Sequence, residues 1–470
     1  MNDEARSTHQ KALRVNLDSS KYGTFAEIGA GQEVARWFFR VGGASGTIAK
    51  AMSAYDMKFS DAIYGPSDRY VSRQRLQMML EREFELLIER LRGERGDRTR
   101  FFVFANTVAA SSYTRKEDGN GWMGMRFQSR PGAEPSEIIL HVRMLDSENL
   151  QQQEALGVLG VNLVHAALYQ HDNPEGILGS LMDDLTRERV ELNMIKFSGP
   201  DFTGVDDRLM SLSLVERGLA DAAMFTADGE VVQASEVLYK KNLLVERGSF
   251  RPVTHVTVDM LECARARFLQ EPKVRAEDVV VLMEMTMKNL AVEGEVDPRD
   301  FLARVDLLGT IGKTVLISNY GEYYRLAGYL FRHTRKMNGI VMGIPSLREI
   351  FEEKYYAHLA GGILESFGRM FKNDLKLYVY PELDPATERI ITVETLEVAP
   401  RLKHLYAYLL QNGCIESIQD YKPEYLPIHS RDILARIAAG DPSWEKLVPA
   451  GVASLIKSRG YLGYRAQANA

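Results

Sequence analysis

The stretch LLVERGSFRPVTHVTVDMLEC, residues 243–263, decides the fold of the second half of this chain. Its first three residues are apolar and predict a buried strand, and Gly248 opens the turn that follows. After the turn, an amphipathic run predicts a helix. A strand, a glycine turn and a helix in this order direct main-chain N–H groups toward an anion at the N-terminus of the helix. We therefore expect turn 248–254 to hold a phosphate-bearing ligand.

Predicted strands and helices alternate along most of the chain from residue 149 onward. The predicted strands cover residues 191–197, 221–226, 243–248, 278–285, 314–318, 339–343 and 375–380. Helices of ten or more residues separate most of them, which implies parallel pairing through crossover connections. The strands are continuous apolar runs, so helices are expected on both faces of the sheet. The expected fold class is α/β.

The first part of the chain has a different pattern. Residues 1–20 are predicted to form a tail without structure of its own, and helical periods predict an α-helical N-terminal region with helices at 32–39, 48–57 and 69–92. Residues 124–128 and 138–145 predict a β-hairpin. Because 470 residues exceed what one hydrophobic core usually organises, two domains are expected. We place an N-terminal α/β domain of unknown role at 1–240 and a second domain at 241–470.

Composition narrows the classes of partner. With 45% hydrophobic and 26% charged residues, the chain has the balance of a globular protein. A formal net charge of −6 argues against a general affinity for nucleic acid or anionic membrane. The two cysteines lie far apart in sequence, so neither a disulfide framework nor a metal site is predicted. No secretion signal and no membrane-spanning run are found, and we expect a cytoplasmic homo-oligomer.

Residues 248–261, GSFRPVTHVTVDML, resemble the first signature of the nucleotidyltransferase superfamily, written GSFxPxTxxH, as in nicotinate- and nicotinamide-mononucleotide adenylyltransferases. The matching residues are Gly248, Ser249, Phe250, Pro252 and Thr254. The resemblance implies that the final histidine of the signature stabilises the α-phosphate during transfer. Here Thr257 stands in the place of that histidine, His255 lies two places early, and Arg251 replaces the usual Asp or Asn.

A second piece near the C-terminus, residues 428–462, resembles the closing segment of the same superfamily, with its ISSTxxR motif. Ser430 fits the phosphate-binding turn, whereas Arg431 falls where the motif has threonine and Leu434 where it has arginine. Together the two pieces imply a Rossmann-like nucleotidyltransferase domain with a parallel sheet over 241–470. The whole chain also resembles an uncharacterised bacterial family labelled nicotinate-nucleotide adenylyltransferase.

The resemblance implies a ligand and roles for individual residues. The expected ligand is a nucleotide or a phosphorylated small molecule, and the active form would use ATP with Mg²⁺ to adenylylate a pyridine mononucleotide. The phosphate would be held by Gly248, Ser249, Phe250, Pro252, Thr254, Ser430 and Arg431, and the catalytic groups would be Arg251, His255 and Thr257.

A non-catalytic role is the main alternative. Losing one preorganised donor typically costs on the order of 10²–10³ in rate, and here a histidine and an arginine are both replaced. A catalytically degenerate nucleotide sensor, scaffold or assembly protein is therefore the second hypothesis. A third is an unrelated catalytic centre around residues 42–50.

Other glycine-rich loops give weaker signals. Residues 40–50, RVGGASGTIAK, precede a predicted helix and fit either a flexible turn or an anion site. Residues 23–32, GTFAEIGAGQ, echo the turn at 248, but no strand is predicted before them, so we interpret the echo as coincidence. Residues 309–314, GTIGKT, follow a predicted helix and open a strand, the reverse of the order in a phosphate-binding loop.

Overall fold

The computed structural model describes residues 7–111, 119–292 and 294–465. Its contacts divide the chain into two units, Met1–Asp221 and Ala222–Ala470. This division lies ahead of the boundary predicted near residue 240. The physical reason is strand pairing, because β7 (Ala222–Phe225) pairs with β11 (Thr314–Ser318), and β8 (Val231–Val232) pairs with β7. Residues 222–240 therefore belong to the sheet of the second unit.

The first unit is built on a six-stranded sheet of order β2-β1-β3-β4-β5-β6. The strands are β1 (Lys21–Gly29), β2 (Ile48–Met52), β3 (Arg100–Ala109), β4 (Gly119–Phe127), β5 (Ser136–Met144) and β6 (Val190–Ser198). Strand β1 pairs in parallel with β2 and β3, whereas the other neighbours are antiparallel. The antiparallel pair β4 and β5 confirms the predicted hairpin.

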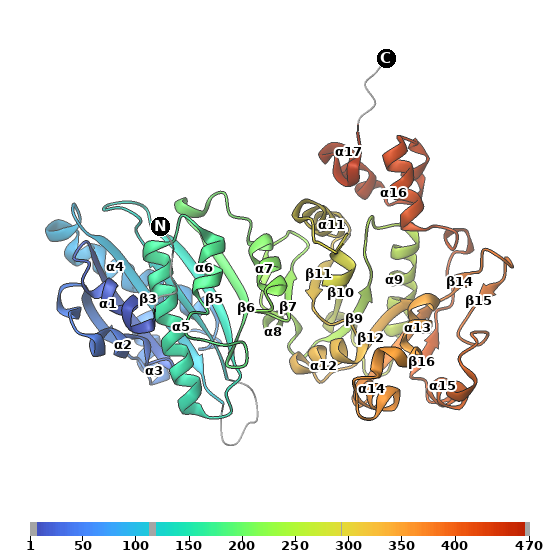
Figure 1. Ribbon diagram of the computed structural model, residues 1–470, viewed down its shortest axis with the longest axis horizontal. Helices are drawn as coiled ribbons and strands as arrows, with labels where there is room; N and C mark the ends of the chain where they lie inside the picture. Colours follow the sequence, from blue (N-terminus) through green and yellow to red (C-terminus); the bar gives the residue numbers. More distant parts are fainter. Residues whose placement is uncertain (1–6, 112–118, 293, 466–470) are drawn as a thin grey trace, which may run out of the picture. The chain divides into compact units, whose positions relative to one another are not determined.

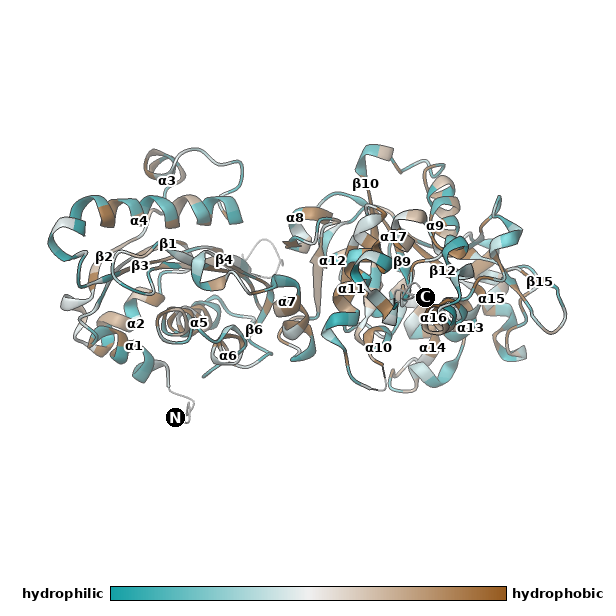
Figure 2. Cartoon of the chain, turned by 90° about the horizontal axis from the view of Figure 1, so that it is seen from above, coloured by the Kyte–Doolittle hydropathy of each residue, from teal (hydrophilic) through white to brown (hydrophobic). Residues whose placement is uncertain are grey.

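Helices cover both faces of this sheet, as Figure 2 shows. One face carries α1 (Thr8–Asn16), α2 (Val34–Val41), α5 (Asn149–Tyr169) and α6 (Pro174–Ser180). The other face carries α3 (Met57–Tyr64) and α4 (Arg73–Arg95). Helix α7 (Asp207–Glu216) contacts β6. Helix α4 packs on β1, β3 and β4 of this sheet.

Two predictions for the first unit are wrong. The predicted tail includes α1, whose Lys11 is 1% exposed and forms an ion pair of 2.7 Å with Asp183. The predicted helix at 48–57 begins instead as strand β2. In both cases partners distant in sequence decide the structure: Asp183 and Asn162 hold the ammonium group of Lys11, and β1 pairs with β2.

The second unit has an eight-stranded sheet of order β16-β13-β12-β9-β10-β11-β7-β8 (Figure 1). Its remaining strands are β9 (Asn242–Arg247), β10 (Val279–Thr286), β12 (Asn338–Gly343), β13 (Leu375–Tyr380) and β16 (Ile415–Ser417). Six strands are parallel, from β11 through β10, β9, β12 and β13 to β16. Numbered along the chain, their spatial order is 3-2-1-4-5-6, the order of a doubly wound Rossmann sheet. The predicted α/β class is confirmed.

Most helices of the second unit connect these strands, and the last two follow the final strand. The helices are α8 (Ala234–Leu238), α9 (His255–Phe268), α10 (Met287–Leu290), α11 (Pro298–Thr310), α12 (Tyr323–His333), α13 (Ile344–Ile350), α14 (Gly362–Met370), α15 (Lys403–Gln411), α16 (Ser430–Ala439) and α17 (Ala450–Arg459). One core cluster joins Val245 and Ile340 of the sheet to Leu330 of α12 and Phe367 of α14. A small antiparallel pair, β14 (Glu382–Leu383) and β15 (Ile390–Ile391), lies outside the main sheet. In the described part of the chain, helices that are both long and apolar enough to cross a bilayer are absent.

Candidate functional site

The strand order of the second unit singles out one place on its sheet. Strand β9 leads through α9 to β10 on one side, whereas its neighbour on the other side, β12, follows β11. In doubly wound sheets, ligands bind beyond the carboxyl ends of the strands where the order reverses in this way. Turn 248–254 leaves the carboxyl end of β9 at this point. The predicted site residues of the turn therefore lie at the edge that a ligand would use.

The apolar part of the turn is packed into the protein. Phe250 has a φ of 47° and is buried, and Val253 and Thr254 are fully buried. A Cβ atom on Gly248 would lie 2.8 Å from the ring of Phe250, so only glycine lets the chain fold over this ring. Ser249, by contrast, is exposed. The hydroxyl of Ser249 is thus the group of this turn that faces solvent.

The N-terminus of α9 is closed by its own side chains. The amide of Thr257 donates to Oγ1 of Thr254 over 3.3 Å, and the amide of Thr254 donates to Oγ1 of Thr257 over 3.5 Å. This reciprocal capping box satisfies donors that would otherwise face an anion. Thr257 is 8% exposed and directs its hydroxyl at the cap. The residue that stands in the place of the signature histidine is therefore used in helix capping.

Charged side chains of helix α11 bond to turn 248–254. Nε of Arg251 donates to Oδ1 of Asp300 over 2.7 Å, and Arg304 forms a second ion pair with Asp300. Arg304, 1% exposed, also donates to the main-chain oxygens of Ser249 (3.3 Å) and Asn289 (2.7 Å). Arg251 and Arg304 thus share one carboxylate, and Arg251 is engaged in an ion pair within the protein.

Two segments from the C-terminal part of the chain meet the turn. The ring of His255 stacks on Tyr425 with 5.2 Å between centroids and an interplanar angle of 14°. Burial, followed by the charge of Lys422, lowers the pKa of His255, which favours a neutral imidazole at pH 7. Oγ of Ser430 donates to the main-chain oxygen of Pro252 over 3.4 Å. Arg431, the next residue, is exposed on α16. The structure therefore brings both signature pieces together.

A buried polar network lies beside the turn, at the carboxyl ends of three strands. Arg247 pairs with the fully buried Glu284 and donates to the main-chain oxygen of Gly321 over 2.8 Å. Oγ of Ser318 donates to the same carboxylate over 2.5 Å. These residues come from the ends of β9, β10 and β11, which are distant in sequence. Hydrophobic runs predicted the three strands, and only their pairing shows that the polar ends meet.

The glycine-rich loops of the first unit differ from their sequence interpretation. Residues 23–29 of the stretch 23–32 lie within strand β1 rather than in a turn, and residues 30–33 lead from β1 into α2. The N-terminus of α2 is nevertheless occupied, because the carboxylate of Glu27 accepts from the amides of Val34 (3.1 Å) and Ala35 (3.2 Å). Loop 40–50 leads from α2 into strand β2 rather than into a helix. It therefore lacks the strand–loop–helix order of a phosphate loop.

Among the residues that the structure describes, groups of three or more His, Cys, Asp or Glu side chains placed to hold a metal ion are absent.

Comparisons with known proteins return structural neighbours alone. No protein-family model and no curated protein sequence matches the chain. A competence/damage-inducible protein from Agrobacterium tumefaciens is 16% identical, with 35% of this chain and 98% of that chain covered and a TM-score of 0.25. A CinA superfamily protein from Enterobacter cloacae is 14% identical, with coverages of 36% and 93% and a TM-score of 0.25. One from Escherichia coli is 16% identical, with coverages of 34% and 84% and a TM-score of 0.22. TM-scores this low assign neither a function nor a site to this chain.

Proposed function

We propose that the second unit binds a nucleotide or another phosphorylated small molecule beside turn 248–254 without transferring its nucleotidyl group. The observation that carries this proposal is the capping box of α9. It lies where the strand order reverses, yet it uses the hydroxyl of Thr257 for the helix itself. The location supports a ligand, and the use of Thr257 argues against catalysis.

The exposed groups around the turn suit a nucleotide. His255 and Tyr425 form a stacked aromatic pair, and Nζ of Lys422 lies 5.1 Å from the centroid of the Tyr425 ring. Aromatic faces of this kind stack on bases. The hydroxyl of Ser249 and the guanidinium of Arg431 add hydrogen-bond donors for phosphate oxygens. Both are on segments that meet at the turn, since Ser430 bonds to Pro252.

Nucleotidyl transfer would need hydrogen-bond donors that here already bond to other groups of the protein. Nucleotidyl transfer depends mainly on positioning and on stabilising charge at the reacting phosphate. Thr257 caps α9 and Arg251 forms an ion pair with Asp300, so two of the three predicted catalytic residues are engaged within the protein. The alternative remains an adenylyltransferase that uses ATP and Mg²⁺ on a pyridine mononucleotide, with His255 as the remaining catalytic group.

The test is to titrate the full chain with ATP, ADP and nicotinate mononucleotide, with and without Mg²⁺, following thermal unfolding and pyrophosphate release. We expect a ligand at 100 times its Kd to stabilise the folded protein by about 2.7 kcal/mol, with no pyrophosphate released. Steady pyrophosphate release from ATP and nicotinate mononucleotide would instead support the adenylyltransferase. Absence of any thermal shift with all three ligands would reject both versions.

Two matched charge-reversal substitutions test whether the nucleotide binds at turn 248–254. Arg431→Glu places a negative charge next to Ser430, and we expect it to weaken nucleotide binding by about tenfold, the loss of one charge-assisted contact. Arg459→Glu on α17, another exposed arginine on a ten-residue helix, serves as the control and should change the affinity by less than about threefold. Equal effects of the two substitutions would contradict a site at the turn.

A further inference from the structure

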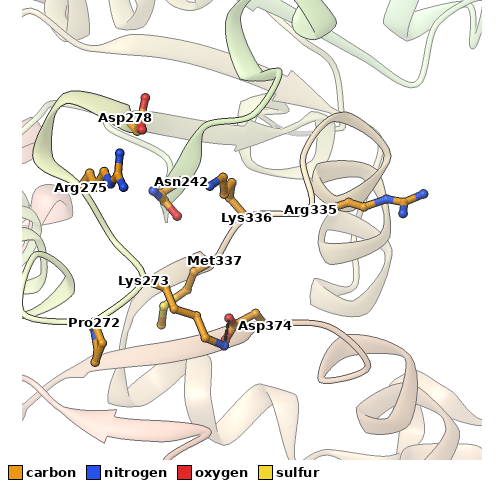
Figure 3. A pocket seen from close by; sticks show the side chains of 9 residues that line it. All are labelled: Asn242, Pro272, Lys273, Arg275, Asp278, Arg335, Lys336, Met337 and Asp374. Atoms are coloured by element: carbon orange, nitrogen blue, oxygen red, sulfur yellow. Dashed lines mark hydrogen bonds and ion pairs between the residues drawn. The ribbon is translucent and has the colours of Figure 1, made fainter.

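A pocket opens at the amino ends of the strands of the same sheet (Figure 3). Its volume is about 420 Å³, within the usual range for small-molecule sites. The lining residues lie at or just before the amino ends of β9, β10, β12 and β13, or in the loop that leads to β10. They are Asn242, Pro272, Lys273, Arg275, Asp278, Arg335, Lys336, Met337 and Asp374.

Positive charge is in excess in this pocket. Its two carboxylates are each paired with a lysine: Asp374 with Lys273 at 2.7 Å, and Asp278 with Lys241 at 3.0 Å. The hydrogen bond from Lys241, followed by the charges of Lys336 and Arg275, lowers the pKa of Asp278. Since both carboxylates are neutralised by other groups, Arg275 and Lys336 supply unbalanced positive charge.

The directions of the side chains concentrate this charge. Figure 3 shows Arg275 and Lys336 directed toward the space around Asn242, whereas Arg335 points away from it. An arginine and a lysine on opposite sides of one space suit a phosphate group, because the guanidinium offers a planar fork of donors and the ammonium a point charge.

The floor of the pocket holds an unsatisfied acceptor. Asn242 is 1% exposed, and its Oδ1 is buried without a hydrogen-bond partner, so its side chain must turn before a ligand can reach this oxygen. A buried polar atom without a partner is costly, so a ligand that donates a hydrogen bond to this oxygen gains affinity. The pocket therefore suits a ligand that carries an anionic group on one part and an O–H or N–H donor on another.

We propose that this pocket binds a small phosphate monoester that carries a hydroxyl or amino donor. Its phosphate lies between Arg275 and Lys336, and its donor bonds to Oδ1 of Asn242. This site goes beyond the proposed nucleotide site at turn 248–254, because the six residues of β9 separate the two by roughly 20 Å.

Calorimetric titration of the full chain with ribose 5-phosphate tests the proposal, with inorganic phosphate and ribose as the two partial ligands. We expect ribose 5-phosphate to bind at least about tenfold more tightly than inorganic phosphate, and ribose to give no saturable signal. Equal affinity for inorganic phosphate and ribose 5-phosphate would overturn the contact to Asn242. No saturation by ribose 5-phosphate up to about 10 mM would overturn the site as a whole.

Two neighbouring substitutions provide a matched pair. Lys336→Glu should weaken ribose 5-phosphate binding by at least about tenfold, whereas Arg335→Glu, whose side chain points away, should change it by less than about threefold. Equal losses in both variants would indicate general charge attraction and overturn the site. Amine acylation gives a readout in the unaltered protein: bound ribose 5-phosphate should slow the modification of Lys336 but not that of the exposed Lys354. Unchanged modification of Lys336 at saturation would also overturn it.

Discussion

At the scale of single residues, position 257 separates a binding role from a catalytic one. A histidine there would extend beyond the first turn of α9, whereas the short side chain of Thr257 folds back onto Thr254. The N-cap Thr254 contributes about 1 kcal/mol to the helix, typical of such a residue, and Thr257 completes the capping box. Thr257 is therefore a structural residue at the position where the signature that this turn resembles has a histidine.

Glu27 of the first unit shows a second residue-scale exchange, in which a carboxylate takes the place of an external anion. Burial raises its pKa from its usual 4.5 to about 7, against the hydrogen bonds from Ala35, Val34 and Asn106. The folded state therefore keeps a proton that the unfolded state releases between pH 4.5 and about 7. Its contribution to stability is present below pH 4.5 and is lost as the pH rises through about 7.

This sign gives a prediction for Glu27→Gln. The native protein loses unfolding free energy between pH 5 and pH 8 as Glu27 ionises. Because glutamine cannot ionise, the variant does not lose this free energy. The unfolding free energy of the variant minus that of the native protein should rise over this range by up to about 3 kcal/mol. Urea unfolding at pH 5, 6, 7 and 8 measures it. Glu33→Gln, which removes a surface partner of Arg36, is the control and should stay within about 0.5 kcal/mol throughout. A difference that stays flat with pH for Glu27→Gln would contradict the buried proton.

At the scale of elements, the sequence predicts those whose structure is decided locally. The apolar run before Gly248 and the amphipathic run after Thr254 appear as β9 and α9, and the runs at 278–285 and 314–318 as β10 and β11. Strand β2 was missed because its residues Ile48–Met52 are largely exposed and lack a buried apolar run. Helix α1 was missed because a lysine in it is buried by partners from α5 and the loop after α6.

The residues of the candidate site also fall into those that the sequence predicts and those that it does not. The turn residues and Ser430 were predicted from their patterns, and the hydrogen bond from Ser430 to Pro252 shows that the two pieces meet. Asp300, Arg304 and Tyr425 were not found, because nothing in their local sequence points to the turn. The packing of α11 and of the loop before α16 decides what the turn residues bond to.

Helix α11 gives the prediction at this scale. Asp300→Asn removes the partner of Arg304, whose guanidinium is buried, and an uncompensated buried charge costs about 3–5 kcal/mol. Arg251→Gln, at the partly exposed end of the same network, should cost less than about 1 kcal/mol. Chemical denaturation of the two variants compares them. Similar small losses in both would show that α11 does not hold the turn through Asp300.

At the scale of the whole molecule, the division of the chain follows strand pairing rather than the position of the signature. The signature strand begins at residue 242, and a boundary just ahead of it is the simplest inference from sequence. The short strands β7 and β8 carry too little pattern to reveal their partner. Strand β7 pairs with β11 and β8 pairs with β7, which extends the second sheet. The first unit therefore ends at Asp221, whose amide donates to Glu191 over 3.3 Å.

This division predicts how fragments of the chain behave. A fragment of residues 222–470 retains all eight strands of its sheet and should unfold cooperatively as a soluble protein. A fragment of residues 241–470 lacks β7 and β8, which exposes the edge of β11 and its buried residues Val315, Leu316 and Ile317. Unpaired apolar edges aggregate, and the loss of the buried side chains of Met224, Phe225 and Leu238 costs at least about 2 kcal/mol each. The shorter fragment should therefore melt at least about 10 °C lower or form aggregates. Circular dichroism melts and size-exclusion chromatography distinguish the two, and equal stability would place the boundary near residue 240 after all.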